Sequence, residues 1–454
     1  MSELFARRAL LPGGWADNVQ IEVDAGRVAA VRCGVALPDD AAGIVAPGVG
    51  NAHSHAFQRA LAGRAEHGTG RDTFWTWRNL MYALSARLDA DALAAIASQL
   101  YAEMLSAGYT SVVEFHYLHR ARGETSVSGA MYEALARAAG TTGIRLIYAP
   151  VLYERAGFDD PAPAPEQARF AMSLDEYLAH VDWALDRVNA PNSVALAAHS
   201  LRAVTPASLT ALAKRSKSLG LPLHIHVAEQ QREVESCLES LGARPVQWLL
   251  DNQEVDTRWT LVHATHVDAL ECERLAKSGA VVALCPSTEG NLGDGLFPVE
   301  DYLRHGGCFA IGSDSHVTVD PFEELRWLEY GQRLTAHKRN VAAVTSGHTG
   351  RDLFVDARTG GARAAGLPGS GLEPGAVADL LVLDEEHPAL LGHGADTLLD
   401  ALVFSAQGKD TPVDRVMVHG EWCVFGGQHR EGEAIRDRYA ATIRSLDLGA
   451  EDGS

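Results

Sequence analysis

The sequence predicts an α/β protein: a (β/α)8 TIM-like barrel with a small β-sandwich domain built from both chain ends. Three observations support this prediction. From residue 110 onward, short β-rich runs alternate with amphipathic helical stretches. Several of these runs end in a histidine or an aspartate. The two chain ends show a different pattern, in which short strands are separated by turns.

Eight β-rich runs are expected to form the barrel strands. They span residues 51–56, 110–117, 144–153, 194–201, 221–229, 259–266, 280–286 and 308–315, with helices such as 91–107 and 209–219 between them. Eight β/α units over about 300 residues match a barrel whose active site lies at the carboxyl ends of the strands. A doubly wound open sheet is the alternative, but it would not gather the ends of its first, fifth, sixth and eighth strands around one point.

The chain therefore divides into three expected parts. Residues 48–373 form the barrel, and residues 1–47 together with 374–430 form the small β-sandwich domain. Residues 431–454 are expected to form a C-terminal helix and tail.

Composition and charge exclude several classes of protein. The chain is 46% hydrophobic and 22% charged, as is usual for a globular protein. No stretch approaches the roughly 18 apolar residues of a membrane helix, and the N-terminus does not resemble a signal peptide. The six cysteines lack C-x-x-C spacing, which indicates reduced thiols and a cytoplasmic location. A net charge of −20 argues against nucleic acid or an anionic membrane as partner.

A His-x-His motif near the first expected strand is the strongest functional signal. His53 and His55 are two residues apart on a strand and so point to the same face, where both can bind one metal ion. Alone, the motif would be weak. Here His226, His263 and Asp314 follow at the ends of other expected strands, which is hard to obtain by chance.

These motifs resemble those of the amidohydrolase superfamily over nearly the whole chain. The resemblance implies that His53, His55, His226 and Asp314 bind a divalent metal ion, for which Zn²⁺ is favoured and iron or manganese remain possible. Some members bind two metals bridged by a carboxylated lysine at the end of strand 4. Here that strand ends at His199-Ser200 and the first lysine is Lys214, so one metal ion is expected.

The same resemblance implies roles for three catalytic residues. Glu229 follows His226 by three residues, as in the deaminase branch, where a carboxyl group transfers protons between the attacking water and the leaving nitrogen. Asp314 is expected to take the first proton from that water. His263 is expected to form hydrogen bonds or relay protons rather than to bind the metal.

Two further segments, residues 74–82 and 285–298, resemble those of superfamily deiminases whose substrate carries two carboxylates and a cationic formamidinium-type group. The resemblance implies a small dianionic substrate. Arg202 and Arg78 are expected to bind its carboxylates. The expected hydrogen-bond partners in the same pocket are Gln58, Tyr117 and His199.

Other interpretations remain open at this point. Arg78 in its tryptophan-rich segment is also suited to a cation–π contact, and Tyr117 to simple packing. Three other functions are a deaminase of a ring substrate such as guanine, an amide-bond hydrolase, and a non-catalytic barrel. The missing lysine disfavours the amide-bond hydrolase. The complete set of expected ligands disfavours the non-catalytic barrel. A homodimer is the expected assembly, because dimers are common for such barrels.

Overall fold

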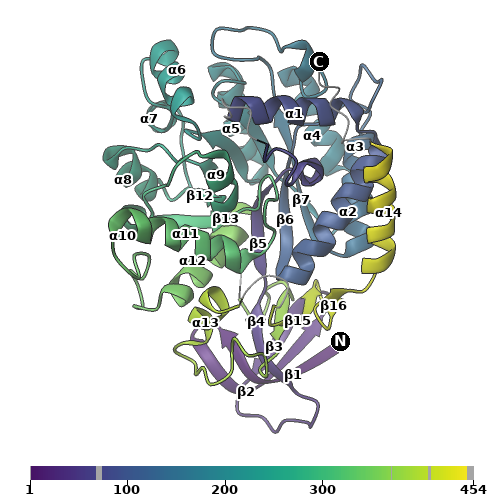
Figure 1. Ribbon diagram of the computed structural model, residues 1–454, viewed down its shortest axis with the longest axis vertical. Helices are drawn as coiled ribbons and strands as arrows, with labels where there is room; N and C mark the ends of the chain where they lie inside the picture. Colours follow the sequence, from purple (N-terminus) through teal and green to yellow (C-terminus); the bar gives the residue numbers. More distant parts are fainter. Residues whose placement is uncertain (1, 68–73, 370, 407–410, 447–454) are drawn as a thin grey trace.

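The computed structural model describes residues 2–67, 74–369, 371–406 and 411–446, without the side chains of residues 74–76. Figure 1 shows a parallel barrel surrounded by helices, with a separate β-sheet at one end that is built from both ends of the chain. The predicted fold class is confirmed. The part of the expected C-terminal tail after residue 446 lies outside the described residues.

The barrel strands follow one another in chain order, and neighbouring strands are parallel. They are β5 (Val49–Ser54), β6 (Tyr109–His116), β7 (Arg145–Leu152), β9 (Leu196–Ser200), β10 (Leu223–Val227), β11 (Trp259–His263), β12 (Val281–Leu284) and β13 (Cys308–Ile311). A short strand, β8 (Ser193–Val194), pairs with β7. A parallel bridge between Ser54 and Asp314 joins the first strand to the end of the last. The expected eight strands are all present.

Several strands end earlier than the apolar runs do, for a conformational reason. Ala228, His263 and Asp314 have φ angles of 52°, 67° and 45°, in the left-handed region that non-glycine residues seldom adopt. The chain therefore leaves the extended conformation just where the expected site residues lie.

Helices surround the barrel and cover its strands (Figure 1). They are α1 (Phe74–Arg87), α2 (Ala90–Ala107), α3 (Ala130–Thr142), α4 (Leu174–Leu185), α5 (Pro206–Leu219), α6 (Gln231–Leu241), α7 (Pro245–Asn252), α8 (Ala269–Ser278), α9 (Pro286–Leu292), α10 (Val299–Arg304), α11 (Pro321–Ala336) and α12 (Thr349–Ala364), with short 3-10 turns at Ala56–Leu61 and Pro165–Gln167. In α2, Asp89 caps the first turn and Gly108, with a φ of 111°, ends the last. Within the described ranges, no helix has the length and apolar character needed to cross a bilayer.

The chain ends form one eight-stranded sheet in the order β17-β16-β15-β14-β4-β1-β2-β3. The strands are β1 (Ser2–Leu11), β2 (Gly14–Asp24), β3 (Arg27–Arg32), β4 (Ala42–Pro47), β14 (Leu380–Leu383), β15 (Val413–Val418), β16 (Glu421–Phe425) and β17 (Gln428–His429). They form one continuous hydrogen-bonded sheet, because β4 pairs with β1 on one edge and with β14 on the other.

Two helices complete the fold. Helix α13 (Leu398–Phe404) follows β14, and α14 (Gly432–Ser445) packs beside α2 on the outside of the barrel (Figure 1). We propose the boundaries 48–373 for the barrel, 1–47 with 374–430 for the small domain, and 431–454 for the C-terminal helix and tail.

Candidate active site

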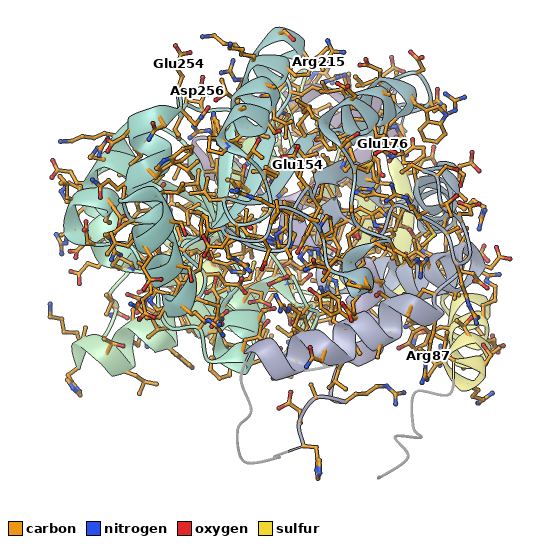
Figure 2. All side chains as sticks on the ribbon, turned by 90° about the horizontal axis from the view of Figure 1, so that it is seen from above. Arg87, Glu154, Glu176, Arg215, Glu254 and Asp256 are labelled. Atoms are coloured by element: carbon orange, nitrogen blue, oxygen red, sulfur yellow. The ribbon has the colours of Figure 1, made fainter. Side chains whose placement is uncertain are left out.

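One pocket at the carboxyl ends of the barrel strands brings the expected site residues together. Its walls include His55, Gln58, Arg78, Tyr117, His199, Arg202, His226, Glu229, His263 and Asp314. His53 lies fully buried against His55 and His226. Figure 2 looks onto the end of the barrel that carries α1, the helix of the pocket residue Arg78. Residues far apart in the sequence therefore meet here because eight parallel strands end at the same rim.

Three imidazole rings converge at the base of this pocket. The Nε2 atom of His53 lies 3.1 Å from Nε2 of His55 and 2.9 Å from Nε2 of His226. Asp314 Oδ1 lies 3.3 Å from His55 Nε2 and 3.6 Å from His53 Nε2. His55 Nδ1 lies 2.8 Å from the carbonyl oxygen of Phe115, so it donates its proton there and leaves Nε2 with a lone pair.

The chemistry of this donor set fits a divalent metal ion. Burial lowers the pKa of His53 and His226 well below the usual value, and the neighbouring histidines lower both further. Burial also lowers the pKa of His55, to about 3, against the opposing hydrogen bond to Phe115. Neutral rings can offer nitrogen lone pairs to a shared cation, and the Nε2 atom of His55 keeps its lone pair for this purpose. Three histidine nitrogens with a carboxylate are ligands that suit zinc.

The backbone around Asp314 is held against the first strand. Asp314 N–H donates to the carbonyl oxygen of His53 at 3.0 Å, and His55 N–H donates to that of Asp314 at 3.2 Å. A Cβ atom on Gly312 would lie 2.7 Å from Cβ of His53 and 2.9 Å from its carbonyl oxygen. Glycine at this position therefore allows the last strand to approach the first closely, and it brings the carboxylate to the histidines.

Two carboxylates face the Nε2 atom of His263, and a third, that of Glu289, contacts Nδ1. The Nε2 atom lies 3.9 Å from Glu229 Oε1 and 3.8 Å from Asp314 Oδ2. Burial alone would lower the pKa of His263, but Glu229, Glu289 and Asp314 raise it to about 10. Burial raises the pKa of Asp314 to about 7, although His263 opposes the shift. This part of the pocket can therefore hold and move protons.

Gln58, Tyr117 and His199 offer polar groups to a ligand. Gln58 Nε2 donates to the hydroxyl of Tyr117 at 2.7 Å, while Gln58 Oε1 is buried without a hydrogen-bond partner among the described residues. Burial lowers the pKa of His199 well below its usual value, and Arg202 and Arg78 lower it further. His199 is therefore a neutral hydrogen-bonding group.

Both predicted arginines line the pocket. Arg78 lies on α1, where its Cζ atom is 5.5 Å from the ring centroid of Tyr82, so the cation–π contact weighed from sequence is present. Arg202 follows β9 in a turn that is held firmly. Glu154 N–H donates to the carbonyl oxygen of Ala203 at 2.8 Å, and Glu154 Oε2 accepts Thr205 N–H at 3.0 Å. Glu154 is labelled in Figure 2.

Sequence reasoning missed part of the pocket wall. The unpredicted lining residues are Trp77, Met81, Tyr82, Tyr153, Phe170, Thr288, Leu292 and Ser315. Trp77, Tyr82 and Thr288 lie in segments already singled out, and Tyr153 ends an expected strand. Phe170 comes from a loop and carries no local sequence signal.

Two further buried histidines, His224 and His316, lie outside the pocket wall. His224 Nε2 lies 2.9 Å from the carbonyl oxygen of Ala364, and His316 Nδ1 lies 3.0 Å from Ser313 Oγ. Both are buried and bonded within the fold.

Comparisons with known proteins agree with this geometry. The amidohydrolase family model matches residues 44–423, and the model for the N-terminal domain of formimidoylglutamate deiminase HutF matches residues 1–42. The chain is 48% identical to formimidoylglutamate deiminase of Pseudomonas aeruginosa over 98% of this chain and 100% of that protein. An amidohydrolase from Brucella melitensis has a similar crystal structure, with a TM-score of 0.93, 40% identity, and coverage of 98% and 100%. A zinc-bound adenosine deaminase from Xanthomonas campestris shares the fold at a TM-score of 0.79 and 22% identity, with 98% of both chains covered.

The fold and the site together define a (β/α)8 barrel with a histidine–aspartate centre at the carboxyl ends of its strands. The matched family model covers most of the chain and includes every barrel strand. The chain belongs to the amidohydrolase family.

Proposed function

We propose that this chain hydrolyses N-formimidoyl-L-glutamate to N-formyl-L-glutamate and ammonia, a step of histidine degradation. One structural observation carries the proposal: a single pocket joins two arginines to a histidine–carboxylate centre. The substrate has the complementary charges, two carboxylates and a cationic formimidoyl group. The 48% identity to a formimidoylglutamate deiminase and the match of residues 1–42 support the same substrate.

We propose that His53, His55, His226 and Asp314 hold one divalent metal ion, with zinc favoured. Such an ion, when bound, lowers the pKa of a water molecule to about 7 and so supplies a nucleophile at neutral pH. The convergence of three neutral imidazoles and a carboxylate supports this assignment.

Three side chains then transfer protons and stabilise the adduct. Asp314 accepts a proton from the attacking water, whose oxygen bonds to the formimidoyl carbon. Glu229 takes the second proton of that water and passes it to the terminal nitrogen, so the carbon–nitrogen bond breaks, ammonia leaves and the adduct oxygen becomes the formyl carbonyl. His263 lies between these two carboxylates and stabilises the oxygen of the adduct through Nε2.

The other pocket residues position the substrate. Arg202 and Arg78 bind the two carboxylates, and both guanidinium groups lie close enough to lower the pKa of His199. Gln58, Tyr117 and His199 form hydrogen bonds to the substrate from the same wall.

Ammonia release from N-formimidoyl-L-glutamate tests the function directly, with guanine and adenosine as comparison substrates. We expect rapid release from the formimidoyl compound alone. Rapid release from a purine and none from the formimidoyl compound would instead establish the alternative function, a deaminase of a ring substrate.

Catalytic roles are tested by substitution. Replacing Glu229 by glutamine should lower kcat by about 10²- to 10⁴-fold, because the leaving nitrogen loses its proton donor. Replacing Glu254, an exposed carboxylate outside the pocket, by glutamine is the control and should leave kcat unchanged. Near wild-type kcat in the Glu229→Gln variant would contradict the assigned role.

Metal dependence is a separate prediction. Dialysis against a chelator should abolish ammonia release, and added Zn²⁺ should restore it. Elemental analysis of the purified protein should find one metal ion per chain, whereas two ions per chain would contradict the single-metal assignment. A cytoplasmic homodimer remains our prediction for location and assembly, and light scattering measures the assembly.

A further inference from the structure

Glu289 occupies a position that the proposed mechanism does not use. It lies on α9, is 4% exposed, and its Oε1 atom is 3.1 Å from Nδ1 of His263. The other ring nitrogen, Nε2, is the one that faces Glu229 and Asp314. Glu289 is therefore bonded to the side of the ring that points away from the reacting groups.

The backbone of His263 adopts an uncommon conformation, so the orientation of its ring depends on contacts such as the one with Glu289. His263 has a φ of 67° and the following Ala264 a φ of 49°, so the strand β11 ends in two consecutive left-handed residues. Such a conformation is uncommon for non-glycine residues and persists only when the surroundings hold it. The ring then needs a fixed partner to keep one orientation.

A structural role for Glu289 is the main alternative. The same Oε1 atom accepts the N–H of Cys285 at 2.9 Å, and Cys285 is the residue directly before the first turn of α9. A metal site formed by His263, Cys285 and Glu289 fits less well. Glu289 Oε1 already accepts two hydrogen bonds, and burial raises the pKa of the Cys285 thiol well above its usual value, which keeps the thiol protonated.

We propose that Glu289 is a positioning residue that accepts the Nδ1–H of His263 and thereby holds Nε2 toward Glu229 and Asp314. This inference rests on the proposed function for its kinetic test. The arrangement matches the general principle by which a buried carboxylate fixes the orientation of a catalytic histidine. Glu289 itself does not line the pocket.

The chain offers a closely matched control in Glu324. This carboxylate is also fully buried and also supports the start of α9, because it accepts Ser287 N–H at 2.9 Å and Ser287 Oγ–H at 2.5 Å. No hydrogen bond joins it to His263 among the described contacts. A purely structural role at α9 should therefore make Glu289 and Glu324 behave alike.

Four variants separate these roles: Glu289→Leu, Glu289→Gln, Glu324→Gln and His263→Ala. Glu289→Leu should lower kcat by about 10²-fold with little change in KM and in metal content. Glu289→Gln retains an oxygen that can accept both hydrogen bonds, so it should recover most of that loss. Glu324→Gln should lower thermal stability but leave kcat within about threefold of wild type.

A double-mutant cycle tests whether Glu289 acts through His263. Adding Glu289→Leu to His263→Ala should lower kcat by less than about threefold, because the group to be positioned is already absent. A further loss of about 10²-fold in that background would overturn the proposal. Equal losses of kcat in Glu289→Leu and Glu324→Gln would also overturn it.

Crystal structures supply a measurement that does not depend on the substrate. The His263 ring should turn away from Glu229 and Asp314 in Glu289→Leu and keep its orientation in Glu289→Gln and Glu324→Gln. An unmoved ring in Glu289→Leu would overturn the proposal. If the wild-type protein released no ammonia from N-formimidoyl-L-glutamate, the proposed function would fail while the ring orientation still decided the role of Glu289.

Discussion

At the scale of single residues, Arg202 offers a sharp test of how the substrate is bound. Replacing it by methionine should raise KM for N-formimidoyl-L-glutamate by about 10- to 100-fold, because a charged hydrogen bond contributes about 1.5–3 kcal/mol. A substrate analogue with one carboxylate should lose much less. Arg274→Met, which alters a partly exposed arginine that pairs with Asp251 outside the pocket, is the control. Equal effects on both substrates would mean that Arg202 binds no carboxylate.

Single residues were predictable where local sequence carried a chemical signal. The paired His53 and His55 stand two apart at the end of a strand, so their shared face follows from the period of the strand. Glu289 and Phe170 could not be assigned in this way. Their partners, His263 and the pocket, are brought to them only by tertiary packing between distant segments.

At the scale of elements, α12 should depend on a glycine at its contact with β13. A Cβ atom on Gly360 would lie 1.9 Å from the carbonyl oxygen of Phe309, so Gly360→Ala must push the helix away from the strand. We expect a loss of unfolding free energy of about 1–3 kcal/mol or more. Gly140→Ala on α3, where a Cβ atom meets nothing within 4 Å, should instead stabilise by about 0.5–1 kcal/mol. Urea unfolding measures both, and equal midpoints for the two variants would contradict this contact.

The elements themselves were predictable to different degrees. The runs 259–266 and 308–315 fixed the place of β11 and β13, but not their ends, because left-handed residues such as His263 and Asp314 are not marked by hydrophobicity. Two adjacent glycines in α12 lower its intrinsic helix propensity by about 1 kcal/mol each relative to alanine. The close approach of the barrel strands to α12 explains why glycines stand at these positions.

At the scale of the whole molecule, the two chain ends form a shared β domain as expected. The strand pairs that join them could not be predicted from the sequence. Turn-separated strands at both ends predicted a shared β domain. β4 pairs with β1, whose residues are near in sequence, and also with β14, whose residues lie more than 300 positions away, and this second pairing makes one continuous sheet. No local pattern specifies such a partner.

A buried ion pair links the barrel to the sheet formed by the chain ends. Arg145, at the start of β7, forms a bidentate ion pair with Asp379, just before β14, with Nη2–Oδ1 at 2.9 Å and Nε–Oδ2 at 3.2 Å. Their side chains are only 3% and 8% exposed. Replacing Arg145 by methionine leaves a buried charge without its partner, which should lower the free energy of unfolding by about 3–5 kcal/mol.

Denaturant unfolding checks this value, and the exposed pair Lys217–Glu254, at 61% and 81% exposure, provides the comparison. Lys217→Met should cost at most about 1 kcal/mol, because water already screens that pair. Both variants should keep wild-type kcat and KM while folded, since Arg145 lies at the amino end of its strand, far from the pocket at the carboxyl end. A folded Arg145→Met protein with normal stability would show that the two parts are held together by apolar packing alone. A normal stability with reduced kcat would show that the sheet influences the site through the barrel.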